Sequence, residues 1–287
     1  MSTSRAADLL HDAVRASGSP ICVGLDPVVE NIPAEIQGSN APDRIEAFSR
    51  TVLEAVRGIA PVVKFQSACF ERYGWEGVRA LERSMHLARQ LGFVVILDAK
   101  RGDIGISAAH YAAAASASGA HFVTVNGYLG ASGIEPFLKE QLGVFVLVRT
   151  SNPDSASFQA VATREHGTVA ELMARVVAKL GSERMGLAGL SDVGAVVGAT
   201  QSNEAAALRH LMPEQIFLIP GFGAQGGSAA DVRAMARPGR RIEESGVLVT
   251  ASRSIIYPKH ESGSWQVAVH GAATSFAAEI REAVAGE

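Results

Sequence analysis

Cysteine is scarce in this chain, and its two thiols form no recognisable pattern. The 287 residues hold only Cys22 and Cys69, and neither belongs to a Cys-x-x-Cys pair or lies in a histidine-rich stretch. This excludes the common zinc-binding motifs, because such sites need several cysteines or histidines at short intervals. We expect both residues to be core thiols of a protein in a reducing compartment.

Long apolar runs and an excess of charge are also missing. No stretch approaches the ~18 to 20 apolar residues that cross a bilayer, and the net charge is only −3 with an isoelectric point near 6.3. The N-terminal stretch MSTSRAADLLHDAVRASG has no apolar core, and Asp8 and Asp12 argue against a transit peptide. Since no basic surface attracts nucleic acid or anionic lipid, we expect a cytoplasmic protein that binds neither nucleic acid nor membrane.

What the sequence does contain is a regular alternation of short apolar runs with longer helix-like segments. The runs are rich in Val and Ile, which is typical of buried strands. Eight such runs lie at 21–26, 62–65, 93–98, 121–125, 144–148, 193–198, 215–220 and 246–252. Between them, apolar residues recur at helical spacing, as in 78–92, in 168–181 and in 42–58, where Asp43 can cap the helix.

Eight strand–helix repeats in a chain of 287 residues predict an α/β protein that folds as a (β/α)8 TIM barrel rather than as an open sheet. We expect one domain over residues 1–287, because no change in composition marks a second one. An N-terminal helix at about 3–17 and a C-terminal helix at about 264–285 would flank the repeats. Polar or Gly/Pro-bearing stretches read as longer loops, at 27–42, 152–165 and 237–244.

Charged residues follow directly after the third apolar run. Since the chemistry of such barrels gathers where the strands end, Asp98, Lys100 and Asp103 in LDAKRGDIG are the first candidates. Asp98 and Lys100 are two residues apart, so on an extended strand their side chains share one face. Taken singly, Asp103 could cap a helix beginning near Ser107, and Asp98 could be a turn residue. Together with Lys64 they form an alternating array in which buried charges are paired.

An alternating array of lysine and aspartate suits a particular chemistry. It can hold a lysine protonated beside a reacting carbon while a carboxylate faces a group that must lose its negative charge. Two like charges about 4 Å apart repel by roughly 4 kcal/mol at an effective dielectric constant of 20. This repulsion is relieved when one of them leaves as a neutral gas, so the array favours a decarboxylation.

A glycine-rich loop follows the seventh apolar run. In IPGFGAQGG the small residues allow backbone amides to approach an anion closely, and Gln225 and Gly226 lie in this loop. Arg253 follows the eighth run, so loop and arginine occupy the two positions where many barrels bind phosphate; alternatively, Arg253 is a solvated strand-end residue. The loop also matches Gly-x-Gly-x-x-Gly, but a dinucleotide fold needs several strand–helix units afterwards and only one strand remains.

These motifs together resemble one enzyme family. DAKRGDIG resembles the Asp-x-Lys-x-x-Asp signature of the orotidine 5′-monophosphate decarboxylases, and the chain is similar in particular to their longer bacterial branch. Six stretches match in order along the chain: VGLDP, VVKFQSACFERYG, LDAKRGDIG, RTSNP, PGFGAQGG and TASRS. The resemblance implies decarboxylation of orotidine 5′-monophosphate to uridine 5′-monophosphate in pyrimidine synthesis, without a metal or an organic cofactor.

The resemblance also implies a catalytic role for four charged residues. This network would consist of Lys64, Asp98, Lys100 and Asp103. Lys100 would donate the proton to C6 of the pyrimidine. Asp103 would reach across the interface of a homodimer into the partner's site.

Further residues would bind the nucleotide, according to the same resemblance. They would be Asp26, Ser151, Asn152, Gln225, Gly226 and Arg253. Asp26 would bind the ribose hydroxyls, and Gln225 and Arg253 would hold the phosphate. Ser151 would contact the pyrimidine, although Thr150 and Asn152 are alternatives for that contact.

Three other functions are compatible with parts of the pattern. A sugar-phosphate enzyme of the same barrel superfamily shares Asp-x-Lys-x-x-Asp, but it needs a glutamate for Mg²⁺ on the second strand, where this chain has Lys64. A class I aldolase would use Lys64 or Lys100 to form a Schiff base. A barrel that only senses a nucleotide would bind it without turnover, and the paired charges after the third run would then have no purpose.

Overall fold

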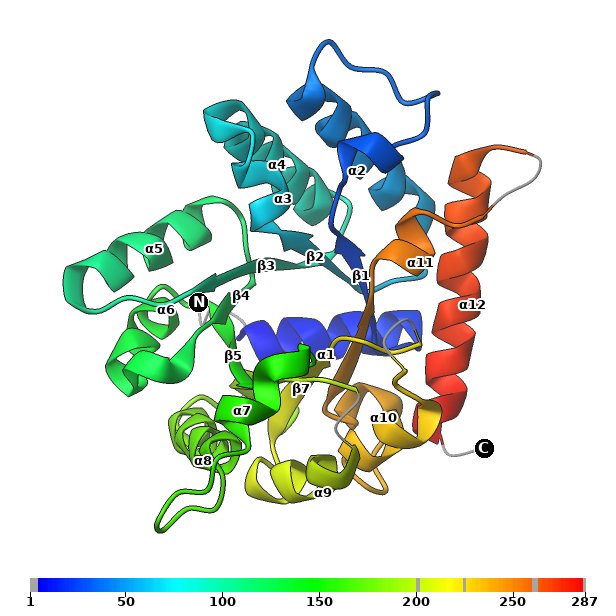
Figure 1. The fold of residues 1–287 in the computed structure, drawn as a ribbon. Coiled ribbons are helices and arrows are strands. Elements are labelled where there is room, and N and C mark those ends of the chain that lie inside the picture. The colour runs from blue at the N-terminus through cyan, green and yellow to red at the C-terminus, as the bar shows by residue number, and fades with distance from the viewer. Residues whose placement is uncertain (1–4, 200–201, 224–225, 260–262, 286–287) are drawn as a thin grey trace.

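Eight parallel strands close into a barrel in chain order, from β1 beside β2 round to β8 beside β1. The computed structural model describes residues 5–199, 202–223, 226–259 and 263–285. The strands are β1 (Ile21–Leu25), β2 (Val62–Gln66), β3 (Val94–Arg101), β4 (Phe122–Val125), β5 (Gly143–Arg149), β6 (Ser191–Val197), β7 (Gln215–Ile219) and β8 (Val247–Ala251). Figure 1 shows the helices arranged around them. The predicted α/β class and (β/α)8 barrel are confirmed.

Helices surround the barrel and connect successive strands (Figure 1). They are α1 (Ala6–Ser17), α2 (Ala41–Val56), α3 (Ser67–Glu71), α4 (Gly74–Gln90), α5 (Gly105–Ala117), α6 (Glu135–Lys139), α7 (Ala156–Gln159), α8 (Val169–Ser182), α9 (Ser202–Leu211), α10 (Ala229–Met235), α11 (Arg253–Ile256) and α12 (Trp265–Ala285). Single turns of 3-10 helix lie in the loops: η1 (Val29–Asn31), η2 (Gly127–Leu129), η3 (Ala131–Gly133), η4 (Pro153–Ser155) and η5 (Ile242–Glu244). None of the described helices is both long and apolar enough to cross a membrane.

The start of α2 differs from the prediction. Its N-cap is Asn40, whose side chain accepts a hydrogen bond from the backbone N–H of Asp43 at 2.9 Å. Asn40 has the extended backbone of an N-cap. Pro42 lies in the first turn, where backbone N–H groups have no partner within the helix, so proline breaks no helical hydrogen bond there. The prediction that Asp43 caps this helix is therefore wrong, because the helix already begins at Ala41.

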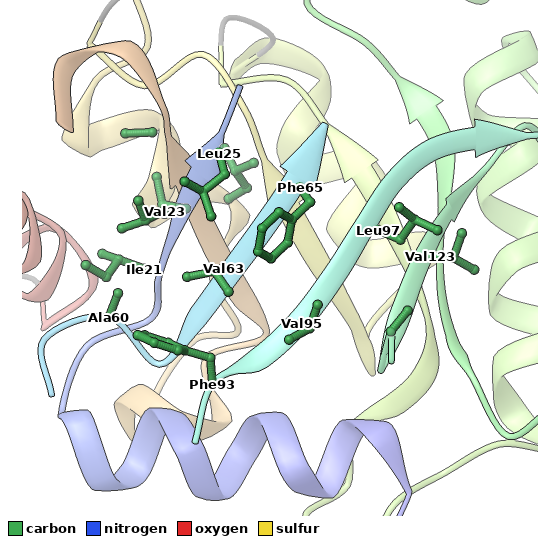
Figure 2. Packing of buried hydrophobic residues seen from close by; sticks show 14 of the residues in the cluster. Ile21, Val23, Leu25, Ala60, Val63, Phe65, Phe93, Val95, Leu97 and Val123 are labelled. Atoms are coloured by element: carbon green, nitrogen blue, oxygen red, sulfur yellow. The ribbon is translucent and has the colours of Figure 1, made fainter. Parts of the chain in front are cut away.

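Side chains alternate between two cores along each strand. Residues such as Val23, Val63 and Val95 pack between the barrel and its helices, in the layer that Figure 2 shows. Their neighbours, such as Cys22 and Ile96, form a second core inside the barrel. Burial raises the pKa of the Cys22 thiol to about 12, as befits the core thiol expected there. Because side chains alternate with a period of two, the inward positions at the end of each strand open into the barrel mouth.

Helix α1 closes the opposite end of the barrel. Leu10 and Val14 pack against the inner core, and Figure 2 shows α1, in pale blue, crossing below the N-terminal ends of the first three strands. Asp192 at the start of β6 fastens this helix, since one carboxylate oxygen accepts the N–H of Ala7 at 2.9 Å and the other pairs with Arg5 at 3.2 Å. An acid is favourable at a helix N-terminus. The C-terminal mouth is therefore the place for a site.

Candidate active site

A cavity of about 500 Å³ opens at the C-terminal mouth of the barrel. Its size is in the range of pockets that bind small ligands. Residues at or just after the end of every strand contribute to its wall. The predicted residues in this wall are Asp26, Lys64, Asp98, Lys100, Ser151, Asn152 and Arg253. The fold thus brings together side chains that lie up to 227 positions apart in the sequence (26 to 253).

A chain of alternating charges lies in this cavity. Lys64 Nζ is 3.4 Å from Asp26 Oδ1 and 2.9 Å from Asp98 Oδ2. Lys100 Nζ is 2.6 Å from the other carboxylate oxygen of Asp98. The side chains of Asp98 and Lys100 thus meet, although Lys100 does not have the extended backbone on which the prediction relied. Each of the four charged groups in this array has an opposite charge beside it.

Burial and pairing together set the charge state of the two central groups. Asp98 is 6% exposed and Lys64 is 5% exposed, so burial alone works against both charged forms. For Asp98, the charges of Lys64 and Lys100 outweigh burial and lower its pKa to about 2. For Lys64, Asp26 and Asp98 outweigh burial and raise the pKa above its ordinary value. Both groups therefore stay ionised near neutral pH.

Two uncharged side chains complete the surroundings of Asp98. Gln66 Nε2 donates a hydrogen bond to Oδ2 at 3.2 Å, and the hydroxyl of Thr124 donates to Oδ1 at 2.8 Å. Neither residue is among those predicted. The alternation of side chains along a strand could have indicated that both point into the barrel. Gln66 lies two residues after Lys64, and Thr124 lies two residues after the inward-facing Phe122.

Asp103 lies outside this array. Its Oδ1 accepts a hydrogen bond from the N–H of Ile104 at 2.8 Å, and its side chain is not part of the cavity wall. Helix α5 begins at Gly105 with Ile104 as its N-cap, so the alternative prediction that Asp103 caps this helix is wrong. Within one chain, the carboxylate is held in the loop just beyond β3.

The residues expected near the pyrimidine lie in the loop after β5. Thr150, Ser151 and Asn152 all line the cavity. Thr150 Oγ1 donates to Asn152 Oδ1 at 2.6 Å. Gln159 of α7 holds Thr150 from two sides, since its Oε1 accepts the Thr150 N–H and its Nε2 donates to the Thr150 hydroxyl, both at 2.8 Å. The hydroxyl of Thr150 is therefore used inside the loop.

Arg149 at the end of β5 fixes this loop to a neighbouring helix. Its side chain is 3% exposed, and its Nε lies 2.7 Å from Glu204 of α9. It also donates to Ser155 Oγ at 2.7 Å. A buried arginine needs such partners to be tolerated. Arg149 was not predicted, although a single arginine that ends an otherwise apolar strand was a usable signal.

Only some of the residues expected to bind the phosphate lie in the cavity wall. Gly221 and Arg253 line the cavity, and Arg253 is exposed at the start of α11. Gly226 is not in the wall, and its N–H donates to the carbonyl oxygen of Gly223 at 3.0 Å. Its φ of +90° is one that favours glycine. Gln225 lies outside the described residues.

The acidic groups of the mouth are not arranged as a metal centre. Among the residues that the structure describes, no three His, Cys, Asp or Glu side chains come together in a way that could hold a metal ion. The ammonium group of Lys64 lies between Asp26 and Asp98 and neutralises the oxygens that a hard cation would use.

The model of one protein family matches residues 19–268, which include all eight strands and every candidate from Asp26 to Arg253. Its description is orotidine 5′-phosphate decarboxylase / HUMPS family. The chain belongs to this family.

Relatives in the orotidine 5′-phosphate decarboxylase family match over nearly the full length. The orotidine 5′-phosphate decarboxylase of Rhodopirellula baltica is 37% identical and the match covers 93% of this chain and 95% of that protein. The protein of the same name from Clostridium kluyveri is 36% identical over 89% of each. The solved structure of Leishmania donovani OMP decarboxylase aligns with a TM-score of 0.78 at 29% identity and covers 98% of both chains. The family resemblance of the sequence motifs is confirmed.

Proposed function

We propose that this member of the orotidine 5′-phosphate decarboxylase family converts orotidine 5′-monophosphate to uridine 5′-monophosphate, without a metal or an organic cofactor. The observation that carries the proposal is the array of Asp26, Lys64, Asp98 and Lys100 at the barrel mouth. It places an ammonium group beside a carboxylate that stays ionised. Such preorganised charges suit an enzyme that expels a carboxylate and protonates the carbon left behind.

In this reaction the bond from C6 to the carboxylate carbon breaks, the electron pair stays on C6, and CO2 leaves. The charge that develops on C6 meets the ammonium group of Lys100, whose side chain is 46% exposed, and Nζ then gives its proton to C6. Asp98 orients Lys100 and faces the departing carboxylate, so their repulsion is lost with CO2. Contacts to phosphate and ribose, remote from C6, supply binding energy that is used at the reacting centre.

The nucleotide would be held by polar residues around the array. We assign this role to Asp26, Ser151, Asn152, Gln225, Gly226 and Arg253. Asp26 would accept hydrogen bonds from the ribose hydroxyls, Ser151 would contact the pyrimidine, and Arg253 would bind the phosphate in a bidentate manner. The position of these three residues in the same cavity wall as Lys100 supports the assignment.

The proposed enzyme is a cytoplasmic homodimer in which Asp103 reaches the partner's site. Support comes from large apolar side chains that are exposed in the segments after β3 and after β4, namely Ile104, Ile106, Tyr111, Tyr128 and Leu129. Ile104, Ile106 and Tyr128 are 61%, 75% and 72% exposed. Large apolar side chains that are exposed close together in the sequence are typical of an interaction surface. A second copy packed against these side chains would carry its own Asp103 towards the array.

The test is the loss of ultraviolet absorbance when the purified chain is mixed with orotidine 5′-monophosphate, with and without EDTA. We expect the orotate absorbance to fall equally in both samples. Orotidine without its phosphate should react far more slowly, because the binding energy of the phosphate is lost.

Other outcomes would identify the alternative functions. Tight nucleotide binding without loss of absorbance would indicate a sensor. Turnover of a sugar phosphate that stops on addition of EDTA would indicate the metal-dependent relatives. A carbonyl substrate trapped by borohydride on Lys64 or Lys100 would indicate a Schiff-base enzyme. Each of these results would contradict the proposed decarboxylase.

A further inference from the structure

Lys100 has an unusual backbone for a residue that carries a side chain. Its φ is +47°, in the left-handed region where the Cβ atom crowds the backbone. The pairing of β3 with β4 is irregular at the same place, because the register shifts between Leu97 and Arg101. Such an irregularity leaves backbone groups without their ladder partners, so a group outside the ladder must hold this turn.

The hydroxyl of Thr124, on β4, is that group. The backbone N–H of Lys100 donates to Thr124 Oγ1 at 2.9 Å, and the hydroxyl donates to Asp98 Oδ1 at 2.8 Å. An amide N–H can only donate and an ionised carboxylate can only accept, so the direction of both hydrogen bonds is fixed. The same Asp98 oxygen accepts from Lys100 Nζ at 2.6 Å.

We propose that Thr124 is a positioning residue, which sets the direction of the Lys100 ammonium group through the Lys100 backbone and the Asp98 carboxylate. The inference rests on the proposed function, because it concerns the same lysine. The three hydrogen bonds close a ring that runs from the Lys100 N–H through Thr124 and Asp98 to Nζ, and back along the Lys100 side chain. While the ring is closed, the backbone of Lys100 stays left-handed and Nζ stays beside Asp98.

The hydroxyl of Thr124, rather than its shape, is what this ring requires. Thr124 is 1% exposed, and valine would fill nearly the same space. Valine would leave the N–H of Lys100 without an acceptor and would remove one donor from Asp98. Lys100 would then gain by relaxing to an extended backbone, and its ammonium group would move. A displacement of about 1 Å at a reacting group can lower a rate by about 100-fold.

The experiment compares the steady-state kinetics of Thr124→Val and Thr124→Ser with orotidine 5′-monophosphate. We expect Thr124→Val to lower kcat by about 10- to 100-fold and to change KM by less than about threefold, because Thr124 acts on the reacting group and not on the phosphate or ribose. Thr124→Ser keeps the hydroxyl and should retain most of the wild-type kcat. Thr51→Val is the matched control, since that hydroxyl donates to Ala47 O within α2, and it should leave kcat unchanged.

Two results would overturn the inference. One is a wild-type kcat in Thr124→Val. The other is an equal loss of kcat in Thr124→Val and Thr124→Ser, which would show that the shape of threonine matters and the hydroxyl does not. If thermal unfolding shows that Thr124→Val does not fold, Thr124→Ala takes its place with the same expectation. A wild-type chain without turnover would instead contradict the proposed function, so the two failures can be told apart.

Discussion

Asp98 is the residue on which the contacts of the site converge. Four side chains donate to its two oxygens, namely those of Lys64, Gln66, Lys100 and Thr124. With a pKa of about 2, this carboxylate is a fixed negative charge and not a proton carrier near neutral pH. Lys100, whose side chain is the more exposed of the two lysines, is therefore the proposed proton donor.

Replacing Lys100 with alanine is therefore expected to lower kcat by at least about 10³-fold. Binding of uridine 5′-monophosphate should be spared, because Asp26 and Arg253 remain in the cavity wall. The absorbance assay measures the first quantity and calorimetric titration of the product measures the second. Lys179→Ala, at an exposed position of α8, is the control. Undiminished turnover of Lys100→Ala would contradict the assignment of the proton donor.

The charged groups of this site could be predicted from the sequence, but the two uncharged side chains that contact Asp98 were missed. Asp98 and Lys100 were recognisable because charges at alternate positions after a buried run are rare unless they are paired. Thr124 and Gln66 are ordinary strand residues, and their letters do not show that they meet a carboxylate on another strand. The left-handed backbone of Lys100 depends on the irregular pairing of β3 with β4, which only the folded structure reveals.

At the scale of elements, β3 and β4 are also linked by a histidine. His121, directly before β4, accepts a hydrogen bond from the backbone N–H of Val95 on its Nδ1 at 2.9 Å. A nitrogen that accepts from an amide must be unprotonated. Burial, assisted by the charge of Arg89, lowers the pKa of His121 to about 4. The strand that carries Asp98 and Lys100 is thus fastened by a neutral imidazole.

We expect this link to make stability depend on pH. The folded pKa of His121, about 4, lies below the ordinary value of 6.5, so between these values the unfolded chain binds the additional proton. The contribution of His121 to the free energy of unfolding should therefore be fully present above pH 6.5. It should decrease as the pH is lowered from 6.5 to about 4. Urea unfolding at pH 7 and pH 5 measures the loss.

The matched variant is His121→Asn, whose side-chain oxygen can accept from Val95 without titrating. It should lose less stability between pH 7 and pH 5 than the wild type does. An identical loss in both proteins would show that other groups cause the pH dependence.

The elements themselves were predictable to different degrees. All eight strands were found, each with ends within three residues of those observed, because parallel strands buried on both faces are nearly continuous apolar runs. The short helices α3, α6, α7 and α11 were not predicted, since each has at most five residues and so cannot show a helical period. The N-cap of α2 was misplaced because Asn40 and Asp43 are equally suitable capping residues by type.

At the scale of the whole molecule, the proposed site needs two chains. In the described part of the chain, the array contains Lys100 while Asp103 lies outside it. Large apolar side chains in the segments after β3 and after β4 are exposed, namely Ile104, Ile106, Tyr111, Tyr128 and Leu129. If each site combines the Lys100 of one chain with the partner's Asp103, two inactive variants can form an active site when they are combined in one dimer.

We therefore expect activity to return when Lys100→Ala and Asp103→Ala are mixed and allowed to exchange subunits. Each mixed dimer has one site with both residues intact, and random exchange makes half of the dimers mixed, so about a quarter of the wild-type activity should appear. A mixture of Lys100→Ala with Lys64→Ala is the control, because both changes fall in the same chain's part of the site and no intact site can form. Activity in the first mixture but not in this control would support the shared site. A lack of activity in both mixtures would contradict it.

The closure of the barrel by α1 also bears on how the proposed reaction ends. Asp192 and Arg5 fasten this helix across the N-terminal end, and apolar side chains such as Val62 and Ile96 fill the interior above it. CO2 formed beside Asp98 consequently has to escape through the opening that the nucleotide still occupies. In the proposed reaction, CO2 that has not yet left could therefore recombine with the carbanion. Net turnover would then depend on a competition, in which the proton of Lys100 would have to reach C6 before the CO2 returns.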